Sequence, residues 1–476
     1  MMWRCRLPLV VLLLLPLSLW AEDRAVFRAG AHAENVNPRK FPISVNGGMA
    51  DRLAKGVHDP LHFRCLALDD GKVKIVIGIL DACVLPRELV DEAKRLAEKA
   101  TGIPASQMLF ASTHTHTAPT LIGTFQSDPD PDYIKDLPAR MARGVTQAVR
   151  NLEPARIGWA SADNPRQVFN RRWIREQALI PRDPFGGSTD RVQMNPGYQS
   201  KGLLKPAGSI DPAVWVVSVQ STSGRPLALL ANYSLHYVGG VEPLSADYFG
   251  AFADRIKHLL KAEESGPPFV GIMSNGTSGD INNINFGGPQ PAKQRDYEQI
   301  CIVANDVAET ALKAQQSIQH RDHISLAAAM REIELGVRMP SASDVERATA
   351  ILEKARGREL RGMEEIYARE TVLLAKFPSR VKLQLQALRL GDLGICAAPC
   401  EVFVEIGQAL RAKSPFPSTF TIELANGYNG YLPTPEQHRL GGYETWRARS
   451  SYLEVDASTQ IQRVLGELLR KVHDTR

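Results

Sequence analysis

The sequence predicts an α/β protein with mixed, largely parallel sheet layers, flanking helices and a single large domain. Strand-like and helix-like segments alternate through the first half of the 476-residue chain, and no obvious linker divides it. Several strand-like runs also end in His, Asp or Glu. Open α/β sheets bind ligands at the carboxyl ends of their strands, so these endings favour the same architecture.

The clearest strand–helix–strand unit lies in the first quarter of the chain. Residues 73–80 are apolar and β-branched, which predicts a buried strand ending at Asp81. Residues 86–100 carry an apolar stripe, which predicts a helix that starts at a proline and stops before Gly102. The apolar run 108–111 predicts the next strand. Because a helix connects the two strands, we expect them to pair in parallel.

The remainder of the chain predicts further elements of both kinds. Residues 178–212 are rich in Gly, Pro and Ser, which favours a long functional loop over a linker. Residues 343–374 predict a helical appendage, and Ser458 is the predicted cap of the last helix. The other predicted elements are strands at 214–219, 227–235 and 381–390, a turn at 224–226, and helices at 247–263 and 297–318.

The N-terminus has the pattern of a secretory signal peptide over residues 1–21. Arg4 and Arg6 precede the apolar stretch 7–19, and Ala21 fits the last position before cleavage. We therefore expect a secreted or periplasmic protein with one domain over 22–476. The apolar stretch is too short for a stable transmembrane anchor.

The charge pattern argues against a nucleic-acid partner. The formal net charge is +5, and charged residues make up 23% of the chain without a basic run that interleaves aromatic residues. A small molecule or lipid is the expected partner class, and the sequence carries no signal for an oligomeric state.

Two closely spaced histidines, His114 and His116, follow the apolar run that ends at Ala111. Side chains at i and i+2 on a strand point to the same face, so both imidazoles would face one cleft. A neutral imidazole there can bind a divalent metal while its neighbour acts as an acid, a base or a hydrogen-bond donor. The alternative is that two polar residues close a strand and bond to nearby loops.

Other strand-like runs end in residues of the same chemical kind. One histidine after a strand is usually structural, but several His, Asp and Glu residues at strand ends predict a shared active site. These strand ends carry Asp81, the 114/116 pair, His236, Asp280 and Glu401.

In its short motifs and their order, the chain resembles the catalytic domain of the neutral (non-lysosomal) ceramidases, which are zinc-dependent amidases that release fatty acid from sphingosine. The resemblance runs from about Ala25 to Glu444. The matching segments are Asp81, 113–119 (THTHTAP), 170–171, 232–236 (NYSLH), 245–247, 279–280, 399–401, 426–431 (NGYNGY) and 443–444.

The resemblance implies a set of site residues. Its zinc ligands match His114, His236, Glu401 and Tyr431, a borderline-to-hard donor set suited to Zn2+. It makes His116 a partner that polarises the carbonyl, and it makes Arg171 and Tyr443 substrate contacts. Asp81 and Asp280 would support neighbouring loops.

The sequence departs from the family pattern at one position of the site. The family serine in Gly-Asp-x-Ser-Pro-Asn is replaced by Asn282, which cannot be a hydroxyl nucleophile but can donate a hydrogen bond to an oxyanion. We also expect no counterpart of the family's immunoglobulin-like C-terminal domain in the residues that follow Tyr443.

These features together predict an exported zinc-dependent hydrolase. It would cleave an amide, most readily of an N-acyl (ceramide-like) substrate, by zinc-activated water. The alternatives are a catalytically silent zinc- or ligand-binding homologue, a hydrolase of non-lipid amides or esters, and a hydrolase that uses another metal.

Overall fold

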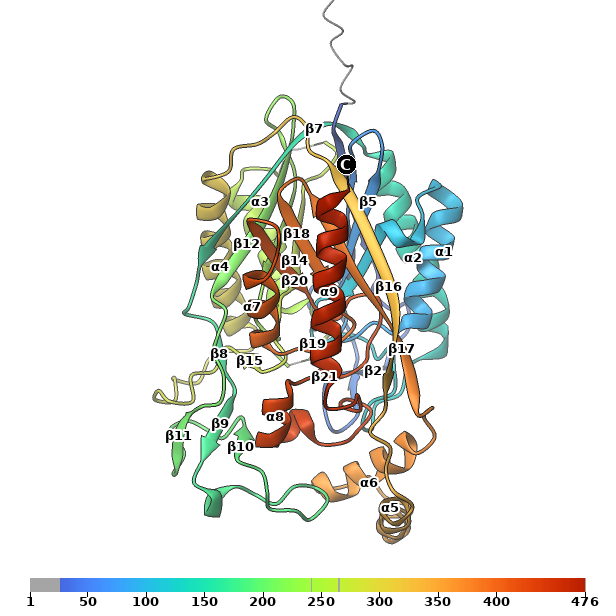
Figure 1. The fold of residues 1–476 in the computed structure, drawn as a ribbon, viewed down its shortest axis with the longest axis vertical. Helices are drawn as coiled ribbons and strands as arrows, with labels where there is room; N and C mark the ends of the chain where they lie inside the picture. The colour runs from blue at the N-terminus through green and yellow to red at the C-terminus, as the bar shows by residue number, and fades with distance from the viewer. Residues whose placement is uncertain (1–25, 241, 264–265, 476) are drawn as a thin grey trace, which may run out of the picture.

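The computed structural model describes residues 26–240, 242–263 and 266–475, so the predicted signal peptide lies outside the described residues. Two β-sheets pack face to face, and helices cover both outer faces (Figure 1). This four-layer arrangement confirms the predicted mixed α/β fold with sheet layers and flanking helices. Within the described ranges, no helix has the length and apolar character needed to cross a bilayer.

The larger sheet has eight strands, and only its two outermost neighbour pairs, β13–β14 and β5–β6, are parallel. The strands in spatial order are β14 (Val270–Asn275), β13 (Pro226–Tyr233), β12 (Ala213–Ser221), β7 (Glu153–Asp163), β1 (Arg28–Asn35), β4 (His62–Asp69), β5 (Lys74–Leu80) and β6 (Met108–Ser112). The prediction of a largely parallel sheet is therefore wrong. Tight turns cause the difference: Gly71 (φ 87°) joins β4 to β5 and Gly224 (φ 89°) joins β12 to β13, and so short a connection allows only antiparallel pairing.

The smaller sheet has four strands and one parallel pair, β18–β20. Its strands in order are β16 (Leu326–Gly336), β17 (Arg380–Leu390), β18 (Leu393–Ala397) and β20 (Ser418–Ile422). Short ladders complete the described strands. They are β19 (Glu401–Val402) with β21 (Tyr431–Leu432), β8 (Phe169–Asn170) with β15 (Ile281–Asn282), β9 (Arg172–Arg175) between β10 (Val192–Met194) and β11 (Leu203–Pro206), and β2 (Ile43–Val45) with β3 (Arg52–Ala54).

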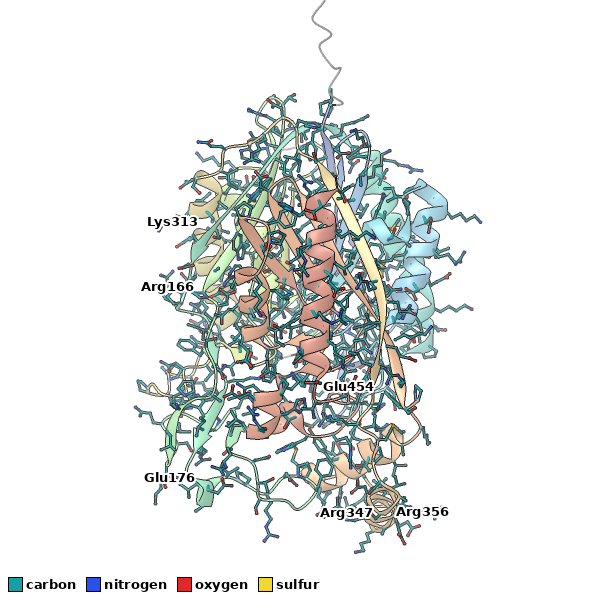
Figure 2. All side chains as sticks on the ribbon, viewed as in Figure 1. Arg166, Glu176, Lys313, Arg347, Arg356 and Glu454 are labelled. Atoms are coloured by element: carbon teal, nitrogen blue, oxygen red, sulfur yellow. The ribbon has the colours of Figure 1, made fainter. Side chains whose placement is uncertain are left out.

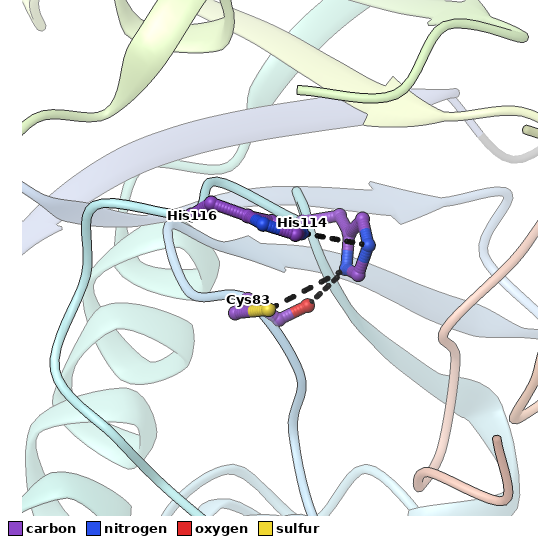
Figure 3. Close-up of side chains that lie close together, drawn as sticks. All are labelled: Cys83, His114 and His116. Carbon is purple, nitrogen blue, oxygen red and sulfur yellow. Dashed lines mark hydrogen bonds between the residues drawn. The ribbon is translucent and has the colours of Figure 1, made fainter. Parts of the chain in front are cut away.

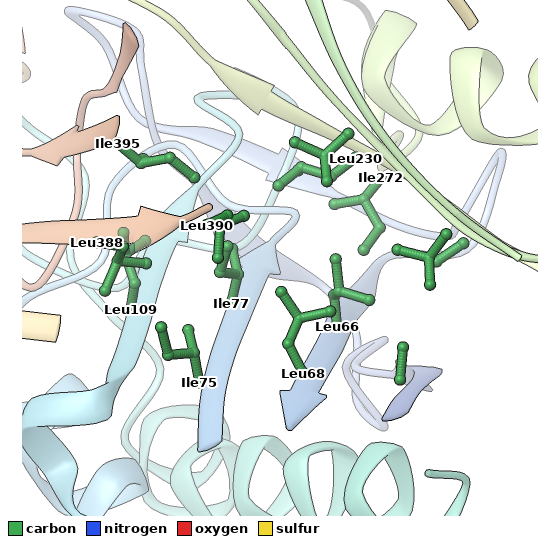
Figure 4. Packing of buried hydrophobic residues seen from close by; sticks show 14 of the residues in the cluster. Leu66, Leu68, Ile75, Ile77, Leu109, Leu230, Ile272, Leu388, Leu390 and Ile395 are labelled. Carbon is green, nitrogen blue, oxygen red and sulfur yellow. The ribbon is translucent and has the colours of Figure 1, made fainter. Parts of the chain in front are cut away.

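The main core lies between the two sheets. In β5, Ile75 and Ile77 face the smaller sheet and pack with Leu388 and Leu390, as Figure 4 shows. Val76 points to the opposite face of β5 and packs under the helices. Both faces of this strand are thus buried, which explains why its sequence is continuously apolar rather than alternating.

Helices cover the outer faces in three groups. Helices α1 (Arg87–Thr101) and α2 (Pro131–Arg150) cover β4 to β6, and α3 (Asp247–Leu259) and α4 (Glu298–Gln316) cover β12 to β14. Helices α7 (Val404–Ala412) and α9 (Ala457–Asp474) cover the smaller sheet, and the short α8 (Pro435–Leu440) lies nearby. The helices predicted at 86–100, 247–263 and 297–318 are confirmed.

The predicted cap of the last helix is wrong. Asp456 precedes α9, and Ser458 is already inside its first turn, where it is buried and bonds to no described residue. The backbone N–H of Ala457 donates to Glu454 O at 3.0 Å, and the helix starts two residues earlier than a cap at Ser458 would give.

The predicted appendage consists of α5 (Ala342–Lys354) and α6 (Gly362–Leu374), at the lower edge of the molecule in Figure 1. It packs against the long 178–212 segment. Arg347, labelled in Figure 2, donates from α5 to Phe185 O, and the ring of Tyr367 on α6 lies 5.9 Å from that of Phe185. The two helices and the 178–212 segment therefore pack together at this edge of the molecule.

Helix α1 carries a fully buried lysine. Lys94 Nζ donates to Asn426 Oδ1 at 2.7 Å, and Asn426 Nδ2 donates to Gln386 Oε1 at 2.8 Å. Asn426 stands in the left-handed region (φ 64°), so this bonding holds the chain in an unfavourable conformation just before Tyr428 and Tyr431.

We expect Lys94→Met to change how stability depends on pH. Burial lowers the pKa of Lys94 from 10.5 to about 7, so between these values the unfolded chain binds more protons than the native protein. Stability must then rise with pH across this window, by on the order of 3 kcal/mol from pH 7 to 9.5. Urea unfolding at both pH values should show this rise in the wild type and not in Lys94→Met. Lys313→Met, at an exposed position on α4 labelled in Figure 2, is the control that should keep the rise.

Candidate metal centre

The carboxyl ends of the parallel strand pairs in the two large sheets supply one cluster of side chains. The segment after β6 carries His114 and His116, the segment after β13 carries His236, and Glu401 follows β18. The larger sheet therefore provides the imidazoles and the smaller sheet provides the carboxylate. These are the strand ends at which the sequence predicted a shared site.

The two neighbouring histidines lie beyond the strand rather than on it. Strand β6 ends at Ser112, and His114 has φ 75°, in the left-handed region. Backbone bonds from Thr113 N to Leu80 O and from His114 N to Ala82 O, both 2.9 Å, hold this turn. The two Nε2 atoms still approach to 3.2 Å. Their proximity is confirmed, but it comes from the turn and not from strand alternation.

His114, His236 and Glu401 converge on one point in the interior. His114 Nε2 lies 3.0 Å from His236 Nε2 and 3.4 Å from Glu401 Oε2, and all three residues are at most 2% exposed. Glu401 Oε2 finds no hydrogen-bond partner among the described residues. A buried carboxylate oxygen without a donor is costly unless a cation neutralises it.

The hydrogen bonds of the two Nδ1 atoms determine which ring nitrogens of His114 and His236 face the Glu401 carboxylate. His114 Nδ1 lies 2.6 Å from Cys83 O (Figure 3), and His236 Nδ1 lies 3.1 Å from Ser278 O. A carbonyl oxygen only accepts, so each Nδ1 carries a hydrogen and each ring turns Nε2 inward, with a lone pair on that atom whenever the ring is neutral. Two lone pairs and a carboxylate then face one another, an arrangement that a cation stabilises.

This donor set fits zinc. Structural and catalytic zinc sites take His nitrogen and Asp or Glu oxygen, and tetrahedral ligands at such bond lengths lie roughly 3.3 Å apart. The ligand atoms of the three residues lie within 4.8 Å of one another. Tyr431 pairs directly with Glu401 across the β19–β21 ladder, and its hydroxyl accepts from Arg171 Nη2 at 3.1 Å.

The electrostatics of the cluster favour one added positive charge. Burial raises the pKa of Glu401, but His114 and Arg171 lower it by more, so the carboxyl is ionised. Burial lowers the pKa of His114, whereas Cys83 and Glu401 raise it by more, so the net pKa is well above the ordinary value and a proton on this ring balances Glu401 when no metal is bound. Burial, Arg171 and the neighbouring imidazoles lower the pKa of His236 well below that value.

His116 lies beside the cluster in a tightly fitted position. Its ring stacks on that of Tyr237 with centroids 3.6 Å apart, and burial and His114 lower its pKa well below the ordinary value. Gly47 has φ 98°, and a Cβ there would come within 2.4 Å of the His116 ring. The ring is therefore held neutral and fixed, and with Cys83 and His114 it forms a second candidate ligand group (Figure 3).

Of the two predicted substrate contacts, one lines a cavity beside the cluster and the other does not. Tyr443 lines a cavity of about 30 Å³ together with His114, His116, Glu401 and Tyr431. Arg171 is buried and already donates to Glu444 Oε1 (3.0 Å), Gly279 O (2.9 Å) and the Tyr431 hydroxyl. Arg171 therefore holds the Tyr431 hydroxyl in position through a hydrogen bond. The cavity has room for about one or two water molecules.

Asn282 and the two aspartates serve neighbouring segments instead of the cavity. Asn282 Nδ2 donates to Asn195 Oδ1 and its Oδ1 accepts from Ile284 N, both at 2.9 Å. Asp280 accepts from Asn170 Nδ2 (2.7 Å) and Val404 N (2.9 Å), and Asp81 pairs with Arg64. Asn282 is not among the residues that line the cavity with the cluster.

Sequence reasoning missed several residues that hold the cluster. Glu423 accepts from Ser278 Oγ and from Val402 N, both at 2.6 Å, so it fixes the segments that carry the Ser278 carbonyl and Glu401. Tyr428 donates to Glu401 Oε1 at 3.0 Å. Glu423 directly follows β20, so the strand-end signal would have found it, whereas Tyr428 has no role apparent from its motif alone.

Comparison with solved structures shows the same fold in two ceramidase structures. The neutral ceramidase from Pseudomonas aeruginosa superimposes with a TM-score of 0.70 at 16% identity, covering 94% of this chain and 74% of that chain. A ceramidase complexed with C2 gives a TM-score of 0.69 at 16% identity, covering 94% and 76%. No protein-family profile matches the sequence, and no curated protein matches it. The chain is thus similar to neutral ceramidases in fold.

Proposed function

We propose that the protein is an exported zinc-dependent hydrolase of amide bonds, with N-acyl compounds as its substrates. The observation that carries the proposal is the convergence of two inward imidazole nitrogens with an unpartnered carboxylate oxygen of Glu401. The fold shared with neutral ceramidases supports amide hydrolysis as the reaction. The signal-like pattern of residues 1–21 supports export.

In this proposal His114, His236, Glu401 and Tyr431 hold the metal. When bound, zinc polarises the carbonyl and lowers the pKa of water toward neutrality. Tyr428 and Glu423 keep Glu401 in place, and Arg171 keeps Tyr431 in place.

His116 and Tyr443 would act on the substrate itself. Neutral His116 can accept a proton from the attacking water at Nε2, the atom that faces the cluster, and later release it to the leaving amine. Tyr443 lines the same cavity and would donate a hydrogen bond from its hydroxyl to the carbonyl oxygen. Asn282 is occupied by its own hydrogen bonds and takes no part.

A second candidate is a zinc-binding protein without turnover. Asn282 stands where the resemblance places a serine, and its amide is bonded away from the cavity. A mechanism that needs a hydroxyl at this position would be disabled, while the metal ligands would remain.

Turnover of a fluorogenic N-acyl aminocoumarin tests these two candidates. We expect the wild type to hydrolyse it, a chelator to stop the reaction, and added zinc to restore it. His116→Ala should lower kcat by roughly 10²–10⁴-fold because a positioned acid–base group is lost, with zinc content unchanged. Bound zinc without turnover on a panel of amides and esters would instead support the binding protein.

A further inference from the structure

The buried lysine of α1 takes no part in the proposed reaction, yet its amine is turned toward the interior. Lys94 is 2% exposed and lines a cavity of about 200 Å³ together with Asp91 and Glu98. Its amine nevertheless donates inward, to Asn426 Oδ1 at 2.7 Å. Burial lowers the pKa of Lys94 to about 7, so an amine at this position costs stability. Buried polar groups of this kind can specify one register among several rather than add stability.

Asn426 receives this hydrogen bond at a junction of three elements. Its Oδ1 also accepts from Phe110 N at 3.3 Å, and its Nδ2 donates to Gln386 Oε1 at 2.8 Å. Gln386 Nε2 in turn donates to Met108 O at 3.3 Å. One fully buried amide thus joins α1, strand β6 of the larger sheet and strand β17 of the smaller sheet.

The same junction fixes how the segment 424–426 lies along β6. Asn426 N donates to Phe110 O at 2.7 Å. Ser112 N donates to Leu424 O at 3.2 Å, so the segment runs antiparallel along the strand. Leu424 (φ 52°) and Asn426 (φ 64°) are both in the left-handed region, which is unfavourable for residues other than glycine. The surrounding hydrogen bonds must therefore hold this segment in place.

Both partners of this pairing lead directly into the metal centre. Strand β6 continues to His114, and residues 424–426 continue into the turn that carries Tyr428 and Tyr431. Tyr428 donates to Glu401 Oε1 at 3.0 Å. A shift of one residue along β6 would turn side chains to the opposite face of the strand. It would also displace the tyrosine-bearing turn relative to the imidazole.

We propose that Lys94 and Asn426 are positioning residues of the metal centre, which fix the register between the strand that leads to His114 and the turn that carries Tyr431. The amine holds the Asn426 amide, and the amide holds the two segments together. Neither residue lines the cavity of about 30 Å³ beside the cluster, so both act through the backbone. This inference rests on the proposed function, because it treats Tyr431 as a ligand of the metal.

The zinc affinity of Lys94→Met tests the proposal. Methionine fills the space of the lysine stem without the donor, and Asn426 Oδ1 keeps its bond from Phe110 N. The dissociation constant for zinc, measured by competition with a chromophoric chelator, should rise roughly 10- to 100-fold, as when other groups that orient a metal ligand are lost. Lys99→Met, at an exposed position on the same helix, is the matched control and should leave it unchanged.

Unfolding of the metal-free proteins separates positioning from a general contribution to the fold. Because burial of the amine costs stability, Lys94→Met should unfold in urea at pH 7 at no lower concentration than the wild type. Weaker zinc binding together with undiminished stability would support the proposal. A Lys94→Met variant that fails to fold would show a purely structural lysine and would contradict it.

A double-mutant cycle tests whether Lys94 acts through Asn426. Glycine adopts φ 64° readily, so Asn426→Gly permits the turn while removing the amide. Asn426→Gly should weaken zinc binding, and adding Lys94→Met to it should weaken binding no further. Fold-changes that multiply in the double variant would contradict the connection between the two residues.

The zinc measurements also distinguish this proposal from that of the reaction. Equal zinc affinity in the wild type and Lys94→Met would overturn the positioning role and leave the proposed hydrolase in place. A wild type that binds no zinc would reject the metal centre, and this inference with it.

Discussion

Purified wild-type protein is expected to contain about one zinc ion per chain, and replacing His114 and His236 together with alanine should remove it. The two Nε2 atoms lie 3.0 Å apart and face the same point, so the double variant deletes both nitrogen ligands. Loss of groups that merely orient zinc ligands weakens affinity 10- to 100-fold, so loss of the ligands themselves should exceed about 100-fold. Elemental analysis after dialysis against a weak chelator measures the outcome.

His320→Ala is the matched control for this measurement. His320 is a partly buried imidazole that bonds to Ser218 Oγ at 3.1 Å and has no contact with the cluster. Its removal should leave the zinc content unchanged. Equal zinc content in the wild type and the double variant would reject the metal centre.

Glu444→Ala is expected to cost roughly 3–5 kcal/mol of the free energy of unfolding, because it leaves two buried arginines without their carboxylate. Glu444 accepts from Arg171 Nε at 3.0 Å and from Arg172 Nη1 at 2.6 Å, and all three side chains are at most 5% exposed. Removing one member of a buried network leaves uncompensated charge, whereas an exposed pair contributes little. Urea unfolding followed by circular dichroism measures the loss.

Glu92→Ala supplies the comparison for an exposed pair. Glu92 lies 2.7 Å from Arg95, whose side chain is 62% exposed, and its removal should not measurably change stability. If Glu444→Ala unfolds at the same urea concentration as the wild type, the buried network does not stabilise this end of the fold.

Much of the fold could be predicted from local patterns. The strand at 73–80, the helix at 86–100 and the strand after it are confirmed because both faces of the strands and one face of the helix are buried. The direction of most strand pairs could not be predicted in this way. It depends on two- to four-residue turns such as the one at Gly71, whose effect on a whole sheet is not visible in the periodicity of the strands.

The sequence predicted the site residues that directly follow strands. It did not predict the residues that hold those site residues in place. His236 and Glu401 stand at strand ends and are brought together as expected. The bond between Arg171 and Glu444 joins positions 273 residues apart, and no spacing rule predicts it. The left-handed backbone conformation of His114 was likewise not predictable, because the alternation of side chains along a strand assumes an extended backbone at this residue.

The origin of the ligands from both sheets has a consequence for biogenesis. Two of the proposed ligands precede residue 240, whereas Glu401 and Tyr431 come from the last quarter of the chain. A chain leaving the ribosome or an export channel from its N-terminus therefore cannot complete this site until almost all of it has emerged. Metal binding would then be a late step in folding, and it would link the larger sheet to the smaller one. Without the metal, the C-terminal quarter of the chain would pack less stably against the rest.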